Sequence, residues 1–167
     1  MSKFPSQWTP VLEEVADEVA TFEELADVAC RVLALQAAFG PVYQVCGPIS
    51  TGGAGSVEKN REVFKFTVEL LRQRGLNMFD QLPLERTMGR LAKSMQGNGY
   101  CMPILEVVYG SIFSSGHVRG GFFLPYWFTS FGNRWERRLL TTLNIEIFEV
   151  PRQFLLPVWP FSSKELR

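Results

Sequence analysis

Two glycine-containing loops carry the residue types that could hold an anionic group. Residues 42–55 read VYQVCGPISTGGAG: a short apolar run breaks into Gly-Pro and a glycine-rich loop, and a helix pattern opens at Ser56. This order of strand, turn and helix start is typical of an anion site, because unpaired N–H groups and the positive end of the helix dipole favour phosphate or carboxylate. The loop has neither the GK[ST] of a Walker loop nor GxGxxG spacing, so a plain turn is the alternative interpretation.

The second loop, residues 125–136, reads PYWFTSFGNRWE and ends on an acid. Ser130 and Gly132 precede a predicted helix start, which makes a second potential anion site. Glu136 falls in the first turn of that helix, predicted over Arg134–Leu143, where the helix dipole alone would stabilise an acid. The chemical interpretation is that a carboxylate beside an aromatic wall and an anion site attacks an electrophilic sugar carbon, dividing a difficult displacement into two easier steps.

The elements that position these loops alternate between strand and helix. Thr21 and Glu24 form a capping box at the start of a helix that ends before Gly40-Pro41. The later elements are predicted as strand Val42–Cys46, a helix from Ser56 to about Arg74, strand Leu76–Phe79, helices Leu84–Met95 and Pro103–Ser114, strand Gly121–Leu124, helix Arg134–Leu143, strand Ile145–Val150, and a tail without regular structure. This alternation predicts an α/β fold with a mostly parallel sheet, whose right-handed crossovers bring 47–55 close to 125–136 at one carboxyl edge.

Composition narrows the class of protein. The chain has 167 residues, 46% of them apolar, and 17 acidic residues balance 17 basic ones, so a single domain is expected and a nucleic-acid polymer is not an expected partner. Three cysteines without CxxC spacing and a single histidine indicate reduced thiols in a cytoplasmic protein and no metal site. No apolar run reaches 18 residues, so no membrane span is expected. The 14 phenylalanines and four tryptophans suggest an apolar pocket or a large subunit interface.

The segment CGPISTGGAGS, Asn60, and the segments LRQRGLNMF and SFGNRWE, in this order, resemble the nucleoside 2-deoxyribosyltransferase superfamily, which includes the 2′-deoxynucleoside 5′-phosphate N-hydrolases. The family pattern is a first strand ending in a Gly-Pro or Gly-Ser turn and a late S-x-G-x-x-x-E at a helix start, and Ser130, Gly132 and Glu136 match that spacing. The resemblance covers about residues 42–150. It divides the chain into an N-terminal helical extension (1–40), the α/β domain (41–150) and a C-terminal arm (151–167).

The resemblance implies a Rossmann-like, flavodoxin-type three-layer domain with about four to five strands that forms homodimers or higher oligomers. It implies cleavage or transfer at the N-glycosidic bond of a nucleoside or nucleotide, without metal or organic cofactor. Glu136 would be the nucleophile, and Ser130 and Gly132 would contact the 5′ group. The loop under the sugar and phosphate would consist of Gly47, Pro48, Ile49, Gly52 and Gly53. Trp127, from its type and place, is predicted to stack on the base.

The chain departs from the family at the usual aspartate near the third strand, which helps to protonate the leaving base. The corresponding stretch reads SSGHVRGGFF and has no acid; Glu106 is the nearest candidate acid, and His117 is another. Two other functions therefore stay open: a nucleotide-binding or sensing module without turnover, and an interaction protein built on the aromatic surface.

Two further side-chain groups have both a functional and a structural interpretation. One group follows the second strand and could bind a ribose hydroxyl or the base, or simply form a turn: Asp80, Gln81 and Glu85. The other could clamp a phosphate or form a solvated helix face: Arg134, Arg137 and Arg138.

Overall fold

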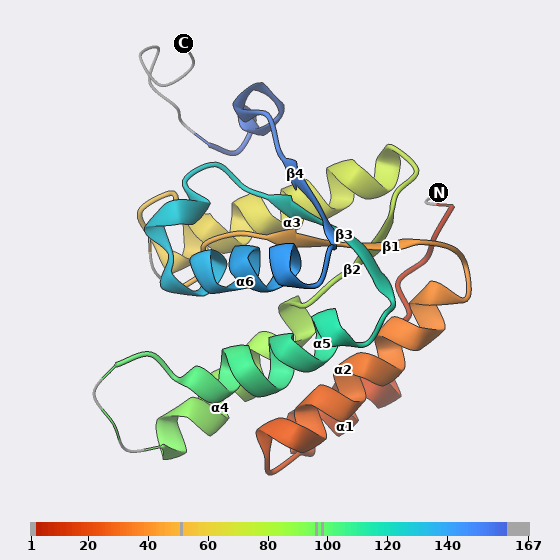
Figure 1. The fold of residues 1–167 in the computed structure, drawn as a ribbon, viewed down its shortest axis with the longest axis vertical. Coiled ribbons are helices and arrows are strands. Elements are labelled where there is room, and N and C mark those ends of the chain that lie inside the picture. The colour runs from red at the N-terminus through yellow and green to blue at the C-terminus, as the bar shows by residue number, and fades with distance from the viewer. Residues whose placement is uncertain (1–2, 51, 96, 98, 160–167) are drawn as a thin grey trace.

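The computed structural model describes residues 3–50, 52–95, 97 and 99–159. Its four strands are all parallel and form one sheet in the order β2-β1-β3-β4 (Figure 1). They are β1 Val42–Cys46, β2 Asn77–Phe79, β3 Val118–Phe123 and β4 Glu146–Glu149. Helices cover both faces of this sheet, so the fold is α/β with the three layers of a Rossmann-like domain, as predicted.

Six α-helices and three other helical segments are present in the described residues. The α-helices are α1 Pro10–Glu18, α2 Phe22–Ala37, α3 Val57–Gln73, α4 Leu82–Ser94, α5 Gly110–Ser114 and α6 Phe131–Thr142. A π-helix spans Ile104–Tyr109, and 3-10 helices span Trp127–Thr129 and Arg152–Leu155. The predicted caps are confirmed, because Thr21 and Glu24 form both bonds of a capping box and Ser56 Oγ accepts from Lys59 N at 3.1 Å.

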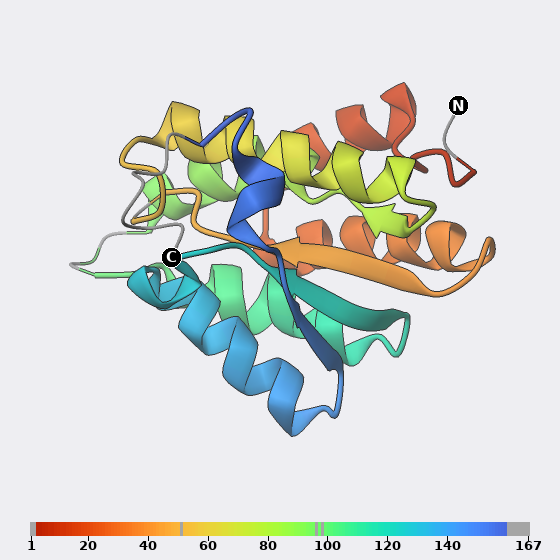
Figure 2. The same cartoon turned by 90° about the horizontal axis from the view of Figure 1, so that it is seen from above.

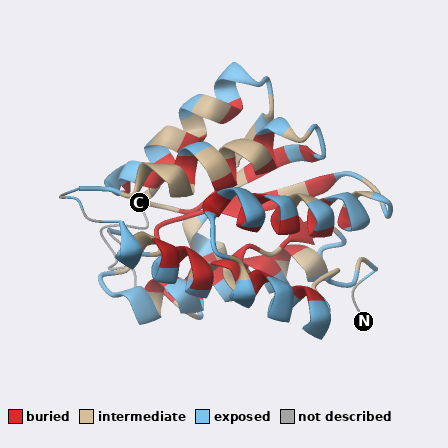
Figure 3. Cartoon of the chain, turned by 90° about the horizontal axis from the view of Figure 1, so that it is seen from below, coloured by how far each residue is buried: buried red, intermediate tan, exposed pale blue. Residues whose placement is uncertain are grey.

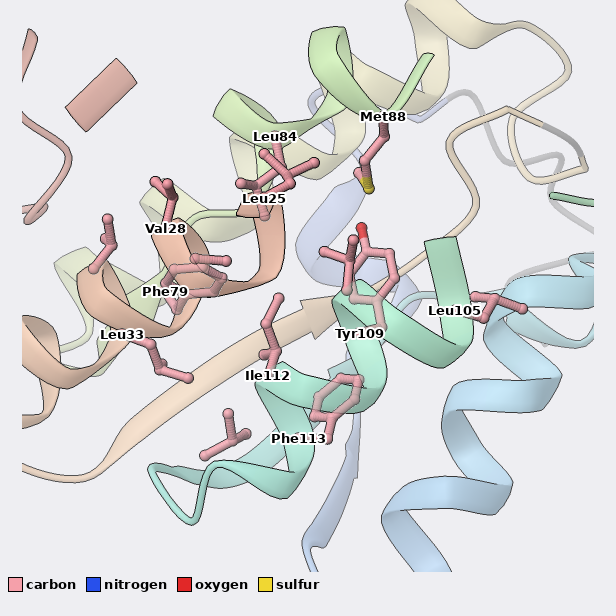
Figure 4. Packing of buried hydrophobic residues seen from close by; sticks show 14 of the residues in the cluster. Leu25, Val28, Leu33, Phe79, Leu84, Met88, Leu105, Tyr109, Ile112 and Phe113 are labelled. Atoms are coloured by element: carbon pink, nitrogen blue, oxygen red, sulfur yellow. The ribbon is translucent and has the colours of Figure 1, made fainter. Parts of the chain in front are cut away.

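Two apolar clusters hold the layers together, and Figure 3 shows buried residues on both sides of the sheet. The first cluster lies between the sheet and α2, α4, α5 and α6, and Leu25, Phe79 and Ile112 are among its buried side chains labelled in Figure 4. The second cluster lies under α3 on the opposite face, where Phe64 and Met78 are fully buried. These faces carry most of the hydrophobic stabilisation, because it scales with apolar area removed from water.

The connections change face beside β1. The chain leaves β1 through α3 on one face to reach β2, then returns through α4 and α5 on the other face to reach β3, as Figure 2 shows from above. In open parallel sheets, such a switch point leaves a crevice at the carboxyl ends of the strands. Leu124 N donates to Cys46 O at 2.9 Å, and Gly53 N donates to Thr129 Oγ1 at 3.2 Å. The predicted meeting of the two loops is therefore confirmed.

The predicted elements need four corrections. The strand predicted over Gly121–Leu124 begins at Val118, and the helix predicted over Pro103–Ser114 is a π-helix continued by an α-helix. The last helix begins at Phe131, because Ser130 caps it. The tail predicted without regular structure contains a 3-10 helix, while residues 160–167 of the predicted C-terminal arm lie outside the described residues.

Of the described residues up to 40, α1 and α2 are helical, and α2 packs into the same cluster as the sheet. Leu33 is fully buried, and Trp8 Nε1 donates to Asp80 O at 2.6 Å, just beyond the end of β2. Asn77 Nδ2 donates to Gln36 O at 3.0 Å and so joins the end of α2 to β2. These bonds fix the position of the segment that leads into α4.

Candidate active site

A cavity of about 170 Å³ opens at the carboxyl edge of the sheet, between the loop that follows β1 and the start of α6. α4 and the π-helix supply other parts of its wall. Because one water occupies about 30 Å³ of liquid, this space suits a ligand group rather than one trapped water. Its polar lining residues are Ser50, Gln81, Glu85, Tyr100, Tyr109, Ser130, Asn133 and Glu136.

Asn60, at the start of α3, fixes the shape of the glycine-rich loop. Its side chain is buried, and its Oδ1 accepts a hydrogen bond from Ala54 N at 2.7 Å. Its Nδ2 donates to the carbonyl oxygens of Ile49 at 3.1 Å and Gly52 at 3.0 Å. One side chain therefore satisfies three backbone groups of the loop. Because each group would otherwise need another hydrogen-bond partner, Asn60 strongly constrains the conformation of the loop. This role of Asn60 was not predicted from the sequence.

Two glycines let the loop pass close to its neighbours. Gly53 has φ +67°, and a Cβ there would lie 2.4 Å from Asn60 Oδ1 and 2.8 Å from Pro48 Cβ. Gly52 has φ +69°, and a Cβ there would lie 2.4 Å from Thr129 Oγ1. Side chains are therefore excluded at both positions by contact as well as by the left-handed backbone. These glycines and Pro48 shape the loop, whereas Gly47 and Ile49 line the cavity.

The start of α6 forms the second part of the wall. Ser130 caps the helix, with Oγ accepting from Asn133 N at 3.4 Å. Gly132 lies in the first turn, where a Cβ would approach the Tyr100 hydroxyl to 3.0 Å. Because the helix begins earlier than predicted, Glu136 lies in the second turn and not in the first. Proximity to the first-turn N–H groups therefore does not account for an acid at this position.

Glu136 is a buried carboxyl group that faces the cavity. Its residue is 3% exposed, and Asn133 Nδ2 donates to its Oε2 at 2.6 Å. Burial raises the pKa of Glu136 to about 8, the Asn133 bond acts in the opposite direction, and the negative charge of Glu85 raises the pKa further. Asn133 Oδ1 is buried without a hydrogen-bond partner among the described residues, so this acceptor is available to a ligand donor.

Glu85 brings a second carboxyl group to the same cavity. It lies in the first turn of α4, and burial raises its pKa to about 7, against the opposing effect of Arg61. Two carboxyl groups with pKa values near neutrality can hold one proton between them. Because the pKa of Glu136 is the higher of the two, the shared proton lies mostly on Glu136, and a minor form carries it on Glu85 and leaves Glu136 ionised. That minor form supplies the ionised group and the protonated one that combined nucleophilic and acid catalysis requires.

Amide and phenol groups complete the wall of the cavity. Gln44 Nε2 donates to Gln81 Oε1, while Gln44 Oε1 is buried without a partner among the described residues. Tyr109 projects from the π-helix, and in Figure 4 its hydroxyl points toward Met88. Burial, reinforced by the neighbouring carboxyl charges, raises the pKa of Tyr109 well above its ordinary value. Short π-helical segments are rare and frequently occur at functional sites.

The structure places two residues outside the cavity, contrary to the roles predicted for them. Trp127 packs against Phe123, with ring centroids 5.8 Å apart, and lies 4.3 Å from the Arg137 guanidinium. These contacts turn its ring toward α6, away from the cavity. Glu106 is exposed on the opposite side of the π-helix, where it lines a separate hollow with Trp135. Neither side chain is therefore placed to act on a ligand beside Glu136.

The remaining basic and imidazole candidates also lie elsewhere. Arg134 Nη1 donates to Phe128 O at 2.6 Å, and Arg137 forms a salt bridge with Glu149 at 3.1 Å. These two arginines are held by neighbouring groups and line a hollow on the outer side of α6. His117 is exposed and precedes β3, at the edge of the sheet opposite the cavity.

Comparisons of the chain with protein-family models, curated proteins and solved structures find no match. The described residues contain no group of three or more His, Cys, Asp or Glu side chains placed to hold a metal ion. Across the same part of the chain, none of the helices has the length and apolar character needed to cross a membrane.

Proposed function

We propose that this protein belongs to the nucleoside 2-deoxyribosyltransferase superfamily and cleaves, or transfers at, the N-glycosidic bond of a nucleoside 5′-monophosphate or a related nucleotide. One observation carries the proposal: the carboxyl group of Glu136 is buried in a cavity at the switch point of the sheet and is oriented by Asn133. Carboxylates beside an electrophilic sugar carbon are the usual nucleophiles of glycosidic bond cleavage.

In the proposed reaction, Glu136 Oε1 attacks C1′ while Asn133 Nδ2 holds Oε2. The C1′–O bond forms as the C1′–N bond breaks, and the electron pair of the broken bond leaves with the base. Water or a second base then attacks C1′, and the carboxylate departs from the glycosyl-enzyme. The chemistry needs neither a metal nor an organic cofactor.

The 5′-phosphate is assigned to the start of α6 and the loop after β1. The first-turn N–H groups of a helix have no partner within the helix and lie at the positive end of its dipole, so they suit an anion. Ser130 and Gly132 lie there, and Gly47 and Ile49 line the facing side of the cavity. Because Gly132 has no side chain, its backbone stays accessible from the cavity.

The test is release of free base from a panel of ribo- and deoxyribonucleoside 5′-monophosphates, followed by chromatography. Wild type and Glu106→Gln are expected to release base, whereas Glu136→Gln is not. Glu106→Gln is the matched control, because it makes the same chemical change at an exposed residue outside the cavity. Equal release by the Glu136→Gln variant would contradict the assigned nucleophile.

A nucleotide-binding module without turnover is the second candidate, and the environment of Glu136 favours it. With its pKa raised to about 8, this carboxyl group is mostly protonated at neutral pH and then cannot attack C1′. This candidate predicts thermal stabilisation by a nucleotide, about 2.7 kcal/mol at 100 times Kd, without base release. An interaction protein predicts no stabilisation by any nucleotide.

A further inference from the structure

Glu85 reaches the cavity from a different element than Glu136. It lies on α4, which follows β2, whereas Glu136 lies on α6, which follows β3. Both side chains line the same cavity, and the charge of Glu85 raises the pKa of Glu136. Within the described part of the chain, the side chain of Glu85 forms no hydrogen bond or salt bridge, and its place in the first turn of α4 favours a carboxylate only through the helix dipole.

A departing base needs a proton, because the electron pair of the C1′–N bond would otherwise give an anionic nitrogen. General acid catalysis of this kind contributes about 10²–10⁴-fold. Apart from Glu136 itself, the titratable groups on the wall are Glu85, Tyr100 and Tyr109. Burial raises the pKa of Tyr100 to about 12 and that of Glu85 to about 7, so Glu85 is the stronger acid of the two. It can act in the minor form of the pair in which Glu85 carries the proton and Glu136, whose pKa is about 8, is ionised.

We propose that Glu85 donates the proton to the leaving base, an assignment that rests on the proposed glycosidic cleavage. The Glu85 O–H bond breaks as the base nitrogen gains the proton and takes the electron pair of the C1′–N bond, while Glu136 bonds to C1′. In the second half, the resulting Glu85 carboxylate takes a proton from water as its oxygen attacks C1′. The net reaction is hydrolysis, and both carboxyl groups return to their starting states.

The surroundings of Glu85 set the direction of its pH dependence. Arg61 on α3 favours the ionised carboxylate, while Glu136 on α6 carries the opposing charge when ionised. Tyr100 and Tyr109 complete the titratable groups around the cavity. Removing the positive charge of Arg61 therefore keeps Glu85 protonated to higher pH, and the pH of maximal kcat/KM should rise.

The first experiment compares two leaving groups in wild type and Glu85→Gln. One substrate is a nucleoside 5′-monophosphate, and the other carries nitrophenolate at C1′ of the same phosphorylated sugar, a leaving group that departs without a proton. Glu85→Gln is expected to lower kcat on the nucleotide about 100-fold or more and kcat on the nitrophenyl substrate less than 10-fold. Equal losses on both substrates would overturn the assignment, as would an unchanged nucleotide rate.

The two proposals fail in different ways. If wild type cleaves neither substrate, the proposed function fails and the role of Glu85 fails with it. If wild type cleaves both and Glu85→Gln shows no dependence on the leaving group, only the role of Glu85 fails. Arg61→Gln gives a second readout at an exposed residue outside the cavity, in case Glu85→Gln does not fold. An unchanged pH optimum at low ionic strength would then contradict the assignment.

Discussion

Replacing Glu136 with glutamine should stabilise the protein, and more so as the pH rises. The folded protein keeps a proton on this carboxyl group up to about pH 8, whereas the unfolded chain releases it near the ordinary pKa of 4.5. The unfolded state therefore binds fewer protons between these values, and the free energy of unfolding of wild type falls as pH rises across that window. Glutamine keeps an oxygen that can accept the Asn133 bond but does not titrate.

The pKa gap sets the size of the effect. The difference between 4.5 and about 8, at about 1.4 kcal/mol for each tenfold step, corresponds to as much as about 5 kcal/mol above pH 8. The difference in free energy of unfolding between Glu136→Gln and wild type should therefore be smallest near pH 4.5 and largest near pH 9. Urea unfolding of wild type and variant at pH 5, 7 and 9 measures this difference directly.

The exposed residue Glu106 supplies the control for this experiment. Glu106→Gln removes one carboxylate without changing the cavity, so its stability should follow that of wild type at every pH. Parallel pH profiles for wild type and Glu136→Gln would refute the reasoning, because they would mean that Glu136 titrates alike in the folded and unfolded states. A variant less stable than wild type at pH 9 would refute it too.

Three other predictions test the loop and the site. Asn60→Ala should lower the free energy of unfolding in urea by about 2 kcal/mol, because three backbone groups of the loop lose their partner. It should also weaken nucleotide binding, and unchanged affinity would contradict this role. Gly53→Ala should destabilise by about 1–3 kcal/mol and by more than Gly55→Ala, which has positive φ but open space; equal losses would exclude the contact. Asn133→Ala should lower the maximum of kcat/KM and shift the falling side of its pH profile to higher pH, because the bond that lowers the Glu136 pKa is lost and this pKa, at about 8, is the higher of the two carboxyl groups; an unshifted profile would contradict this.

Local patterns in the sequence were sufficient to predict most of the fold. The capping box of Thr21 and Glu24, the cap at Ser56 and the strand Val42–Cys46 depend on residues close together in the chain. The switch at β1 follows from the alternation of strands and helices, and it placed the two loops at the same edge. The start of α6 was predicted too late, because Phe131 and Gly132 do not indicate a helix without the Ser130 cap.

The composition of the cavity was less predictable, because side-chain direction depends on packing between distant elements. Glu85 was recognised only as part of a group beside a turn; its position facing Glu136 depends on how α4 crosses the sheet. Trp127 was predicted to face a base, but its contact with Arg137 turns it outward. Asn60 lies on the same buried side of α3 as Val63 and Phe64. A polar residue at such a position indicates a side chain that must find hydrogen-bond partners, and this pattern could have suggested its role.

The most direct test of the central claim is to trap the glycosyl-enzyme. With a 2′-fluorinated deoxyribonucleoside 5′-monophosphate, breakdown of the glycosyl-enzyme is slowed more than its formation. The covalent glycosyl-enzyme therefore accumulates. Intact mass spectrometry is expected to show the added mass of one phosphorylated sugar, and peptide mapping is expected to place it on Glu136. An adduct on Glu85, or base release at a normal rate without any adduct, would contradict the account.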